Sequence, residues 1–339
     1  MKDTVSARRL LSPLIPLYHL ALAFRGFRIR SGLEPVRRLR FPVVSIGNLS
    51  MGGSGKTPLT VALAKALSRR GLRVDVLSRG YGRQSQLAAR VSPDGTAEEF
   101  GDEPLLIARE AGVPVYVAPQ RYSAGLLAEA DAQQSDGENH QPIVHLLDDG
   151  FQHRQLYRDV DILLLNRQDW RDWLLPAGNL REPLGAVRRA SAIAIPADEP
   201  KFEDDLRAWG WQGRILRLRR TMNIPAVNGP IAAFCGIARP KQFFAGLEAA
   251  GLKLALRQVF PDHHRYTGLD LDRLVAAARD ARATAFVTTE KDLVRLRALA
   301  STFSESMPLL TARLRIEIEN QDAAIDWLVG RLGPASALP

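Results

Sequence analysis

A glycine-rich turn followed by a lysine and a threonine could bind a polyphosphate. The segment Ser50-Met-Gly-Gly-Ser-Gly-Lys56-Thr57 lies between an apolar run and an amphipathic stretch. Backbone N–H groups of such a turn surround phosphates at the start of a helix, while the lysine contacts the β- and γ-phosphates and the threonine hydroxyl contacts Mg²⁺. Ser50 replaces the first glycine of the usual pattern, and we expect Gly52 and Gly53 to supply flexibility. The predicted nucleotide-binding residues are Ser50, Met51, Gly52, Gly53, Ser54, Gly55, Lys56 and Thr57.

Two adjacent carboxylates could complete a Mg²⁺ site. Asp148 and Asp149 directly follow the apolar run Ile143–Leu147, which we predict to be a strand. Ligands of parallel α/β sheets gather at the carboxyl ends of the strands, and Mg²⁺ prefers oxygen ligands. A turn or a helix cap is the alternative, because Asp-Gly is common in turns. We predict that Thr57, Asp148 and Asp149 hold the metal.

A carboxylate and an imidazole from distant parts of the chain could move a proton. Asp102 opens a predicted helix, where it is either an N-cap or a general base that accepts the proton of an attacking hydroxyl. Asp262-His263 follows the predicted strand Leu254–Val259 and is either a solvated loop or a pair that orients a proton acceptor across a cleft. The turn Ser78-Arg-Gly-Tyr-Gly-Arg83 either contacts phosphate or closes a surface loop. Local sequence leaves these alternatives open.

Strand-like and helix-like patterns alternate along the chain, which predicts a doubly wound α/β fold with a mainly parallel sheet. We expect three parts: an N-terminal basic and apolar segment, 1–40; a nucleotide-binding domain, 41–215; and a smaller C-terminal α/β domain, 216–339, that closes the cleft. The predicted strands are Arg73–Ser78, Val115–Ala118, Ile143–Leu147, Ile162–Leu165, Ala192–Ile195, Ile231–Cys235, Leu254–Val259 and Ala283–Val287. The predicted helices include Leu59–Arg70, Glu103–Ala111, Tyr122–Ala130 and Lys241–Ala250, and Thr289 is the expected cap of a further helix.

Composition excludes several classes of protein. The chain has 339 residues, 46% of them hydrophobic, so it can bury a substantial core. The single cysteine, Cys235, excludes an internal disulfide framework and a cysteine-rich zinc site, and we expect it to be buried. The apolar segment near the start contains Pro13 and Pro16 and lacks a small-residue cleavage site, so we expect no cleaved signal peptide.

Most of the excess positive charge lies near the N-terminus. Residues 1–40 hold nine Lys and Arg against two acidic residues, which accounts for +7 of the net charge of +9. From Leu17 a helix would align Leu17, Leu20, Ala21, Phe24 and Phe27 along one stripe flanked by arginines. This pattern predicts a helix that lies on an anionic membrane surface; docking on the protein's own core is the alternative, and both can hold. The stretch is too short to span a bilayer, and no nucleic-acid recognition motif accompanies it.

Taken together and in this order, the motifs resemble the tetraacyldisaccharide 4′-kinase family over nearly the whole chain. The basic N-terminus, residues 78–82 and Asp262-His263 carry part of this resemblance. Five further segments carry the rest: Gly47-Asn48 with Gly52-Gly-Ser-Gly-Lys-Thr-Pro58, Gly101-Asp-Glu-Pro104, Asp148-Asp-Gly-Phe-Gln-His153, Leu175-Pro-Ala-Gly-Asn-Leu-Arg-Glu-Pro183 and Thr288-Thr-Glu-Lys-Asp292. The resemblance implies ATP as donor, Mg²⁺, a lipid disaccharide monophosphate as acceptor, and attachment to the cytoplasmic face of the bacterial inner membrane as a peripheral or monotopic protein. No obligate protein partner is evident.

The resemblance also implies roles for single residues. Lys56 would act on the phosphates, Asp102 would be the base and His263 its tuning partner. Glu103 would lie close to the metal or the nucleotide, and Arg121, Arg181 and Glu182 would line the site. A membrane-associated nucleotide hydrolase with a regulatory or assembly role is the competing hypothesis. That hypothesis explains the phosphate-binding turn but not an acid–base pair.

Overall fold

A computed structural model describes residues 8–52, 55–135, 141–296, 299–300 and 307–333. Within them one twelve-stranded sheet has the order β10-β9-β11-β12-β8-β7-β6-β1-β5-β2-β4-β3. Only β8–β12 and β3–β4 pair antiparallel among the described strand pairs, so the predicted α/β fold with a mainly parallel sheet is confirmed. The strands are β1 Val43–Asn48, β2 Arg73–Ser78, β3 Ala89–Arg90, β4 Val115–Val117, β5 Ile143–Asp148, β6 Val160–Leu164, β7 Ala192–Pro196, β8 Arg214–Asn223, β9 Ile231–Cys235, β10 Leu254–Val259, β11 Ala285–Thr289 and β12 Leu309–Ile318.

Helices lie between the strands, as the alternation predicts. They are α2 Ile15–Arg30, α3 Lys56–Arg69, α4 Ala97–Phe100, α5 Asp102–Ala111, α6 Arg121–Ser135, α7 Arg167–Trp170, α8 Pro200–Ala208, α9 Pro240–Ala249, α10 Gly268–Asp280, α11 Glu290–Leu296 and α13 Gln321–Leu332, with short 3₁₀ helices at Ser12–Leu14 and Leu184–Arg189. The predicted helix from Leu59 begins three residues earlier, at Lys56. Thr289 caps α11 as expected, because its hydroxyl accepts a hydrogen bond from the backbone N–H of Asp292.

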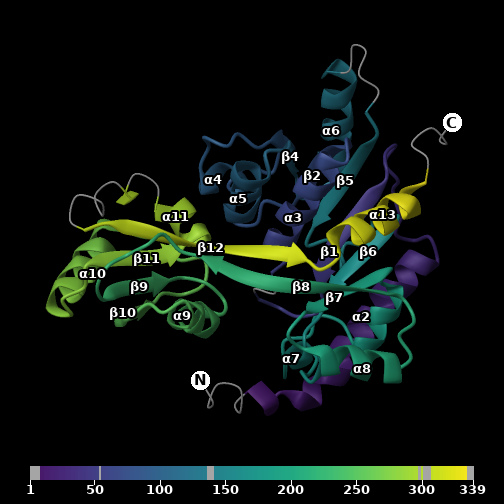
Figure 1. Ribbon diagram of the computed structural model, residues 1–339. Coiled ribbons are helices and arrows are strands. Elements are labelled where there is room, and N and C mark those ends of the chain that lie inside the picture. The colour runs from purple at the N-terminus through teal and green to yellow at the C-terminus, as the bar shows by residue number, and fades with distance from the viewer. Residues whose placement is uncertain (1–7, 53–54, 136–140, 297–298, 301–306, 334–339) are drawn as a thin grey trace.

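Two long strands join the two halves of the chain. β8 pairs with β7 on one side and with β12 on the other, and Figure 1 shows this ribbon running between the N-terminal half of the chain and the group formed by β9, β10 and β11. The last helix, α13, returns to the first half, where Ile325 and Leu328 join the core that β1 and α3 build. Residues 216–339 therefore do not all belong to the second group, and the domain boundaries themselves stay a prediction.

Helix α2 has apolar side chains on two faces. Ile15, Tyr18 and Leu22 pack against the core cluster that includes residues of the 3₁₀ helix Leu184–Arg189 and of α8. Leu20 and Phe24, of the predicted stripe, are 65% and 61% exposed. No described helix is both long and apolar enough to cross a membrane. The helix is thus docked on the protein and still presents an apolar stripe outward.

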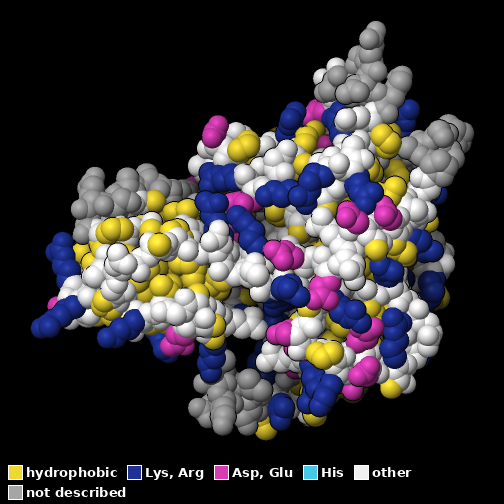
Figure 2. Space-filling view, viewed as in Figure 1, with side chains coloured by type: hydrophobic (Ala, Val, Ile, Leu, Met, Phe, Trp, Pro, Cys, Tyr) yellow, Lys and Arg dark blue, Asp and Glu magenta, His cyan; other side chains and the backbone are white. Residues whose placement is uncertain are grey.

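The molecular surface differs between the two halves. Figure 2 shows apolar side chains gathered over the C-terminal group at the left, whereas basic and acidic side chains alternate over the rest of this face. Cys235 is buried in β9, as its apolar neighbours predict.

Candidate active site

The glycine-rich turn connects β1 with α3. Gly52 and Gly55 have φ angles of +100° and +94°, which non-glycine residues rarely adopt, so glycine is required at both positions. The N–H of Met51 donates to the carbonyl of Asn179 over 2.8 Å, which fixes the start of the turn. Gly53 and Ser54 lie outside the described residues. The parts that are described lie at the carboxyl end of β1, the edge at which ligands of parallel sheets bind.

Lys56 lies inside a ring of polar groups at the start of α3. Its Nζ donates to Oδ1 of Asn48 over 3.2 Å and lies 3.6 Å from Oδ1 of Asp149. Arg181 reaches Asp149 with both terminal nitrogens, at 3.0 and 3.2 Å. Burial opposes ionisation of Asp149, but the charges of Lys56 and Arg181 outweigh it and lower its pKa to about 2. Asp149 is therefore ionised and balanced by two cations.

Asp148 has the opposite electrostatic environment. Its carboxylate is 1% exposed and accepts a hydrogen bond of 3.1 Å from the hydroxyl of Thr60. Burial, together with the charges of Glu103 and Asp149, raises the pKa of Asp148 to about 7. The carboxylates of Asp148, Asp149 and Glu103 thus repel one another, and a divalent cation would stabilise them.

The predicted metal residues fit Mg²⁺ only as part of its coordination sphere. No group of three or more acidic, histidine or cysteine residues in the described ranges is arranged to hold an ion by itself. Thr57 is buried at the start of α3, and the adjacent Asp148 and Asp149 end β5. Mg²⁺ in nucleotide sites takes one or two carboxylates and fills its remaining positions with phosphate oxygens and water. The donor set therefore suits an ion that arrives with a nucleotide.

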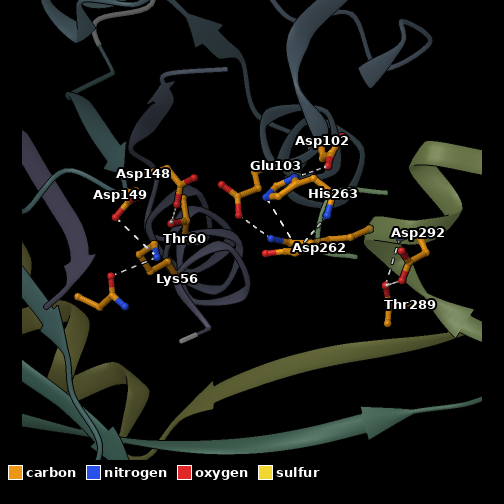
Figure 3. A network of polar contacts seen from close by, with 12 residues as sticks. Lys56, Thr60, Asp102, Glu103, Asp148, Asp149, Asp262, His263, Thr289 and Asp292 are labelled. Carbon is orange, nitrogen blue, oxygen red and sulfur yellow. Dashed lines mark hydrogen bonds and ion pairs between the residues drawn. The ribbon is translucent and has the colours of Figure 1, made fainter. Parts of the chain in front are cut away.

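Glu103 lies between this cluster and the second half of the chain, as Figure 3 shows. Nζ of Lys291 on α11 donates to its carboxylate over 2.5 Å. The charge of Lys291 lowers the pKa of Glu103, in spite of its burial. The ion pair therefore connects the first turn of α5 to the first turn of α11.

Asp102 and His263 come together across the two halves. Nδ1 of His263 lies 3.0 Å from Oδ2 of Asp102, and Nε of Arg295 on α11 donates to the same oxygen. Burial opposes ionisation of Asp102, but the hydrogen bond from His263 and the charge of Arg295 lower its pKa. Gly101, not Asp102, is the N-cap of α5, so the capping alternative is wrong. The contact exists without any closing movement of the second half.

The turn of residues 79–83 brings Tyr81 close to His263, and two glycines allow this. A Cβ on Gly101 would lie 3.0 Å from the backbone of Gly80, and one on Gly80 would lie 2.8 Å from the carbonyl of Phe100. Both glycines have positive φ angles, of +90° and +65°. The 79–83 turn can therefore pack directly on the start of α5, which places the Tyr81 ring 5.4 Å from that of His263.

The remaining predicted residues fall into two places. Arg121 is 9% exposed at the start of α6; burial lowers its pKa to about 10, although the charge of nearby Asp149 opposes the shift. Burial and the charge of Arg121 lower the pKa of His153 to about 3. Glu182 instead accepts a hydrogen bond of 2.8 Å from Arg189, while its neighbour Arg181 faces Asp149. Arg121 and Arg181 thus lie near Asp149, whereas Glu182 pairs with Arg189.

Several polar residues of the site were not singled out from the sequence. Asn48 joins Lys56 to Arg181, and Gln152 donates to the carbonyl of Asn48 over 2.8 Å. Both lie inside motifs that the sequence displays, so their position could have been read there. Arg295 carries no such signal except that it follows Lys291 by one helical turn.

The chain is therefore an α/β protein with a large, mostly parallel sheet and charged side chains gathered near the strand ends. A family model described as Tetraacyldisaccharide-1-P 4′-kinase matches residues 7–332. The chain belongs to this family.

Relatives and one solved structure agree with this assignment. A tetraacyldisaccharide 4′-kinase of Koribacter versatilis is 41% identical, with 94% of this chain and 98% of the relative aligned. One of Desulfotalea psychrophila is 34% identical, with 90% and 92% aligned. The crystal structure of LpxK from Aquifex aeolicus, described as an "apo" form in complex with ATP, superposes with a TM-score of 0.73 at 31% identity and covers 96% of this chain and 99% of that chain.

Proposed function

We propose that this protein transfers the γ-phosphate of ATP to the 4′-hydroxyl of tetraacyldisaccharide 1-phosphate. One observation carries the proposal: a lysine and two carboxylates at the strand ends face an Asp102–His263 pair, with Glu103 between them. Phosphoryl transfer needs this combination of charge stabilisation on one side and a proton acceptor on the other. Membership of the family supports the disaccharide as acceptor.

The nucleotide would occupy the glycine-rich turn. Lys56 would contact the β- and γ-phosphates in place of its present contacts with Asn48 and Asp149. Thr57, Asp148 and Asp149 would hold Mg²⁺, which neutralises developing charge on the phosphate oxygens when bound. Arg121 and Arg181 add positive charge on the same side. In this proposal Glu182 lines the acceptor side, because it lies next to Arg181 and near Tyr18 of α2.

Asp102 would accept the proton of the acceptor. Its Oδ2 contacts His263 and Arg295, and no donor in the described part of the chain contacts Oδ1, so Oδ1 can receive the 4′-hydroxyl. The hydroxyl oxygen forms the new P–O bond as the bond between the γ-phosphorus and the bridging oxygen breaks. The proton passes to Asp102, and ADP is the leaving group.

Helix α2 would bring the site to the acceptor at the cytoplasmic face of the inner membrane. The hydroxyl of Tyr18 donates to the carbonyl of Arg181 over 3.0 Å, which ties the helix to a residue that contacts Asp149. Its outward stripe of Leu20 and Phe24 can enter the interface while flanking arginines meet anionic lipid. A peripheral protein held in this way reaches a hydroxyl at the membrane surface.

The test uses protein in detergent micelles with Mg²⁺, γ-labelled ATP and tetraacyldisaccharide 1-phosphate. We expect label on the lipid with the wild type, a loss on the order of 10²-fold or more with Lys56→Met, and none of that loss with Lys65→Met, which lies exposed on the same helix. Lysine is needed at the first of these positions because it offsets charge on the transferring phosphate. Acceptor-independent ATP hydrolysis without lipid labelling would support the hydrolase hypothesis instead.

A further inference from the structure

Arg295 uses its whole guanidinium group at the junction of the two halves. Nε donates to Oδ2 of Asp102, and Nη1 donates to the carbonyl of Gly236 over 2.6 Å. Nη2 lies 3.3 Å from Nδ1 of His263. The side chain is only 5% exposed, so water does not screen these contacts strongly. One planar group therefore contacts both members of the proposed proton-transfer pair.

The buried carboxylate of Asp292 holds the guanidinium of Arg295 in place. Asp292 accepts hydrogen bonds from Nη1 of Arg295 at 3.2 Å, from the hydroxyl of Tyr266 at 2.9 Å and from the N–H of Gly236 at 3.0 Å. The hydroxyl of Thr289 donates to its other oxygen over 2.6 Å. Asp292 is fully buried, and four donors fix its carboxylate. The guanidinium that it binds is therefore held rigidly next to Asp102 and His263.

The backbone of His263 depends on the same surroundings. Its φ angle is +60°, a conformation that non-glycine residues adopt only when other contacts enforce it. Its N–H lies 3.2 Å from the carbonyl of Gly236, the acceptor that Arg295 also uses. The histidine loop and the guanidinium are therefore anchored to one carbonyl.

We propose that Arg295 is a positioning residue for the Asp102–His263 pair: it fixes Oδ2 of Asp102 against Nδ1 of His263 and thereby leaves Oδ1 for the acceptor hydroxyl. The inference rests on the proposed function. Oδ2 of Asp102 accepts the hydrogen bond from Nε of Arg295 and lies within hydrogen-bond distance of Nδ1 of His263, so the guanidinium sets where the carboxylate and the imidazole meet. A lysine cannot reproduce this, since an ammonium group lacks the planar fork that contacts three partners at once.

The positive charge of Arg295 also keeps Asp102 ionised. Burial alone would raise the pKa of Asp102, but the hydrogen bond from His263 and the charge of Arg295 lower it. Other charged or titratable groups on the described elements that meet near Asp102 include Glu103 on its own helix, Lys291 on α11, Asp262 in the histidine loop, and Arg79, Tyr81 and Arg83 on the 79–83 turn. Removal of the guanidinium therefore raises the pKa of Asp102, and a base that must be ionised loses activity at acidic pH first.

The experiment compares Arg295→Lys and Arg295→Met with Arg313→Met, whose arginine lies 4.0 Å from Glu110 and is half exposed. Lipid phosphorylation is measured as kcat/KM from pH 5 to 9 at saturating MgATP, together with the melting temperature. We expect both Arg295 variants to lose roughly 10²-fold at every pH because the pair is misplaced. Only Arg295→Met should also move the acidic limb of the profile to higher pH, and Arg313→Met should match the wild type.

Two results would overturn the inference. One is wild-type kcat/KM in both variants; the other is an equal loss in both with an unmoved limb and a lowered melting temperature, which indicates general structural damage. If Arg295→Met does not fold, Arg295→Gln replaces it in the comparison with Arg295→Lys. If the wild type phosphorylates no lipid, the proposed function fails. The positioning role of Arg295 is then tested by the ring NMR signals of His263, assigned through His263→Ala. These signals must shift in Arg295→Lys, and unchanged signals reject the inference.

Discussion

Oδ2 of Asp102 lies 3.0 Å from Nδ1 of His263, although 161 positions separate the two residues. Asp102 is the first residue of α5, and His263 lies in the loop after β10. Figure 3 shows them on the side of Glu103 that is remote from Lys56. The two residues can meet because β8 and β12 join the two halves of the chain in one sheet.

Replacing either member of this pair should reduce phosphoryl transfer without loss of nucleotide. For Asp102→Asn and His263→Ala we expect kcat to fall by about 10²–10⁴, the usual contribution of general acid–base catalysis, while the affinity for MgATP stays near that of the wild type. The matched control is His264→Ala, because His264 contacts Asp270 at 3.1 Å in a similar pair next to the site. Equal losses in the His263 and His264 variants would show that the pair has no special role.

Asp148 should make the stability of the nucleotide-free protein fall as pH rises. Its pKa in the folded state is about 7, against an ordinary value of 3.8, so the folded state binds this proton more tightly than the unfolded chain does. The resulting stabilisation is complete below the ordinary pKa and is lost as pH rises through about 7. Asp148→Asn should therefore increase the free energy of unfolding relative to the wild type by on the order of a few kcal/mol at pH 8, and by less at pH 5.

Chemical denaturation at several pH values measures this difference. Asp204→Asn, on the exposed face of α8, is the control and should leave the pH profile of stability unchanged. MgATP should stabilise the wild type more than Asp148→Asn at pH 8, because the ion would offset the buried charge. A gap between Asp148→Asn and wild type that stays constant from pH 5 to 8 would contradict the raised pKa.

The Glu103–Lys291 ion pair should couple the two halves energetically. In a double-mutant cycle with Glu103→Gln and Lys291→Met we expect a coupling energy of about 1 kcal/mol or more, since both side chains are largely withdrawn from solvent and 2.5 Å apart. The pair Arg219–Glu319, whose arginine is 64% exposed, should give about 0–0.5 kcal/mol in the same measurement. Additive effects at Glu103 and Lys291 would mean that the pair does not connect the halves.

The outward stripe of α2 should contribute to membrane binding but not to the stability of the folded protein. Leu20→Glu combined with Phe24→Glu should lower the fraction of protein that sediments with anionic vesicles, because two apolar side chains leave the interface, and should leave the melting temperature within a few degrees of the wild type. Leu269→Glu, an exposed leucine on α10, is the control. Unchanged vesicle binding in the double variant would remove the stripe from the anchoring surface.

The local elements could be predicted because their signals are local. Strand β9 has the predicted bounds, since it is a short apolar run that both faces of a parallel sheet bury. Positive φ angles at Gly52 and Gly55 follow from the glycine-rich turn. The sequence pattern predicts the start of α3 three residues too late, because Lys56 and Thr57 lack the apolar period of the helix that they open.

The chemical groups and the elements that carry them can be read from the sequence: the glycine-rich turn before α3, the carboxylates at the end of β5, Asp102 at the start of a helix and His263 after a strand. Which of these groups meet depends on the tertiary structure. Arg295 contacts Asp102 and His263, Lys291 pairs with Glu103, and α13 packs on the first half. These contacts join positions far apart along the chain, and no local pattern encodes them, because they arise from how β8 and β12 align the two halves and from the exclusion of water around the charges.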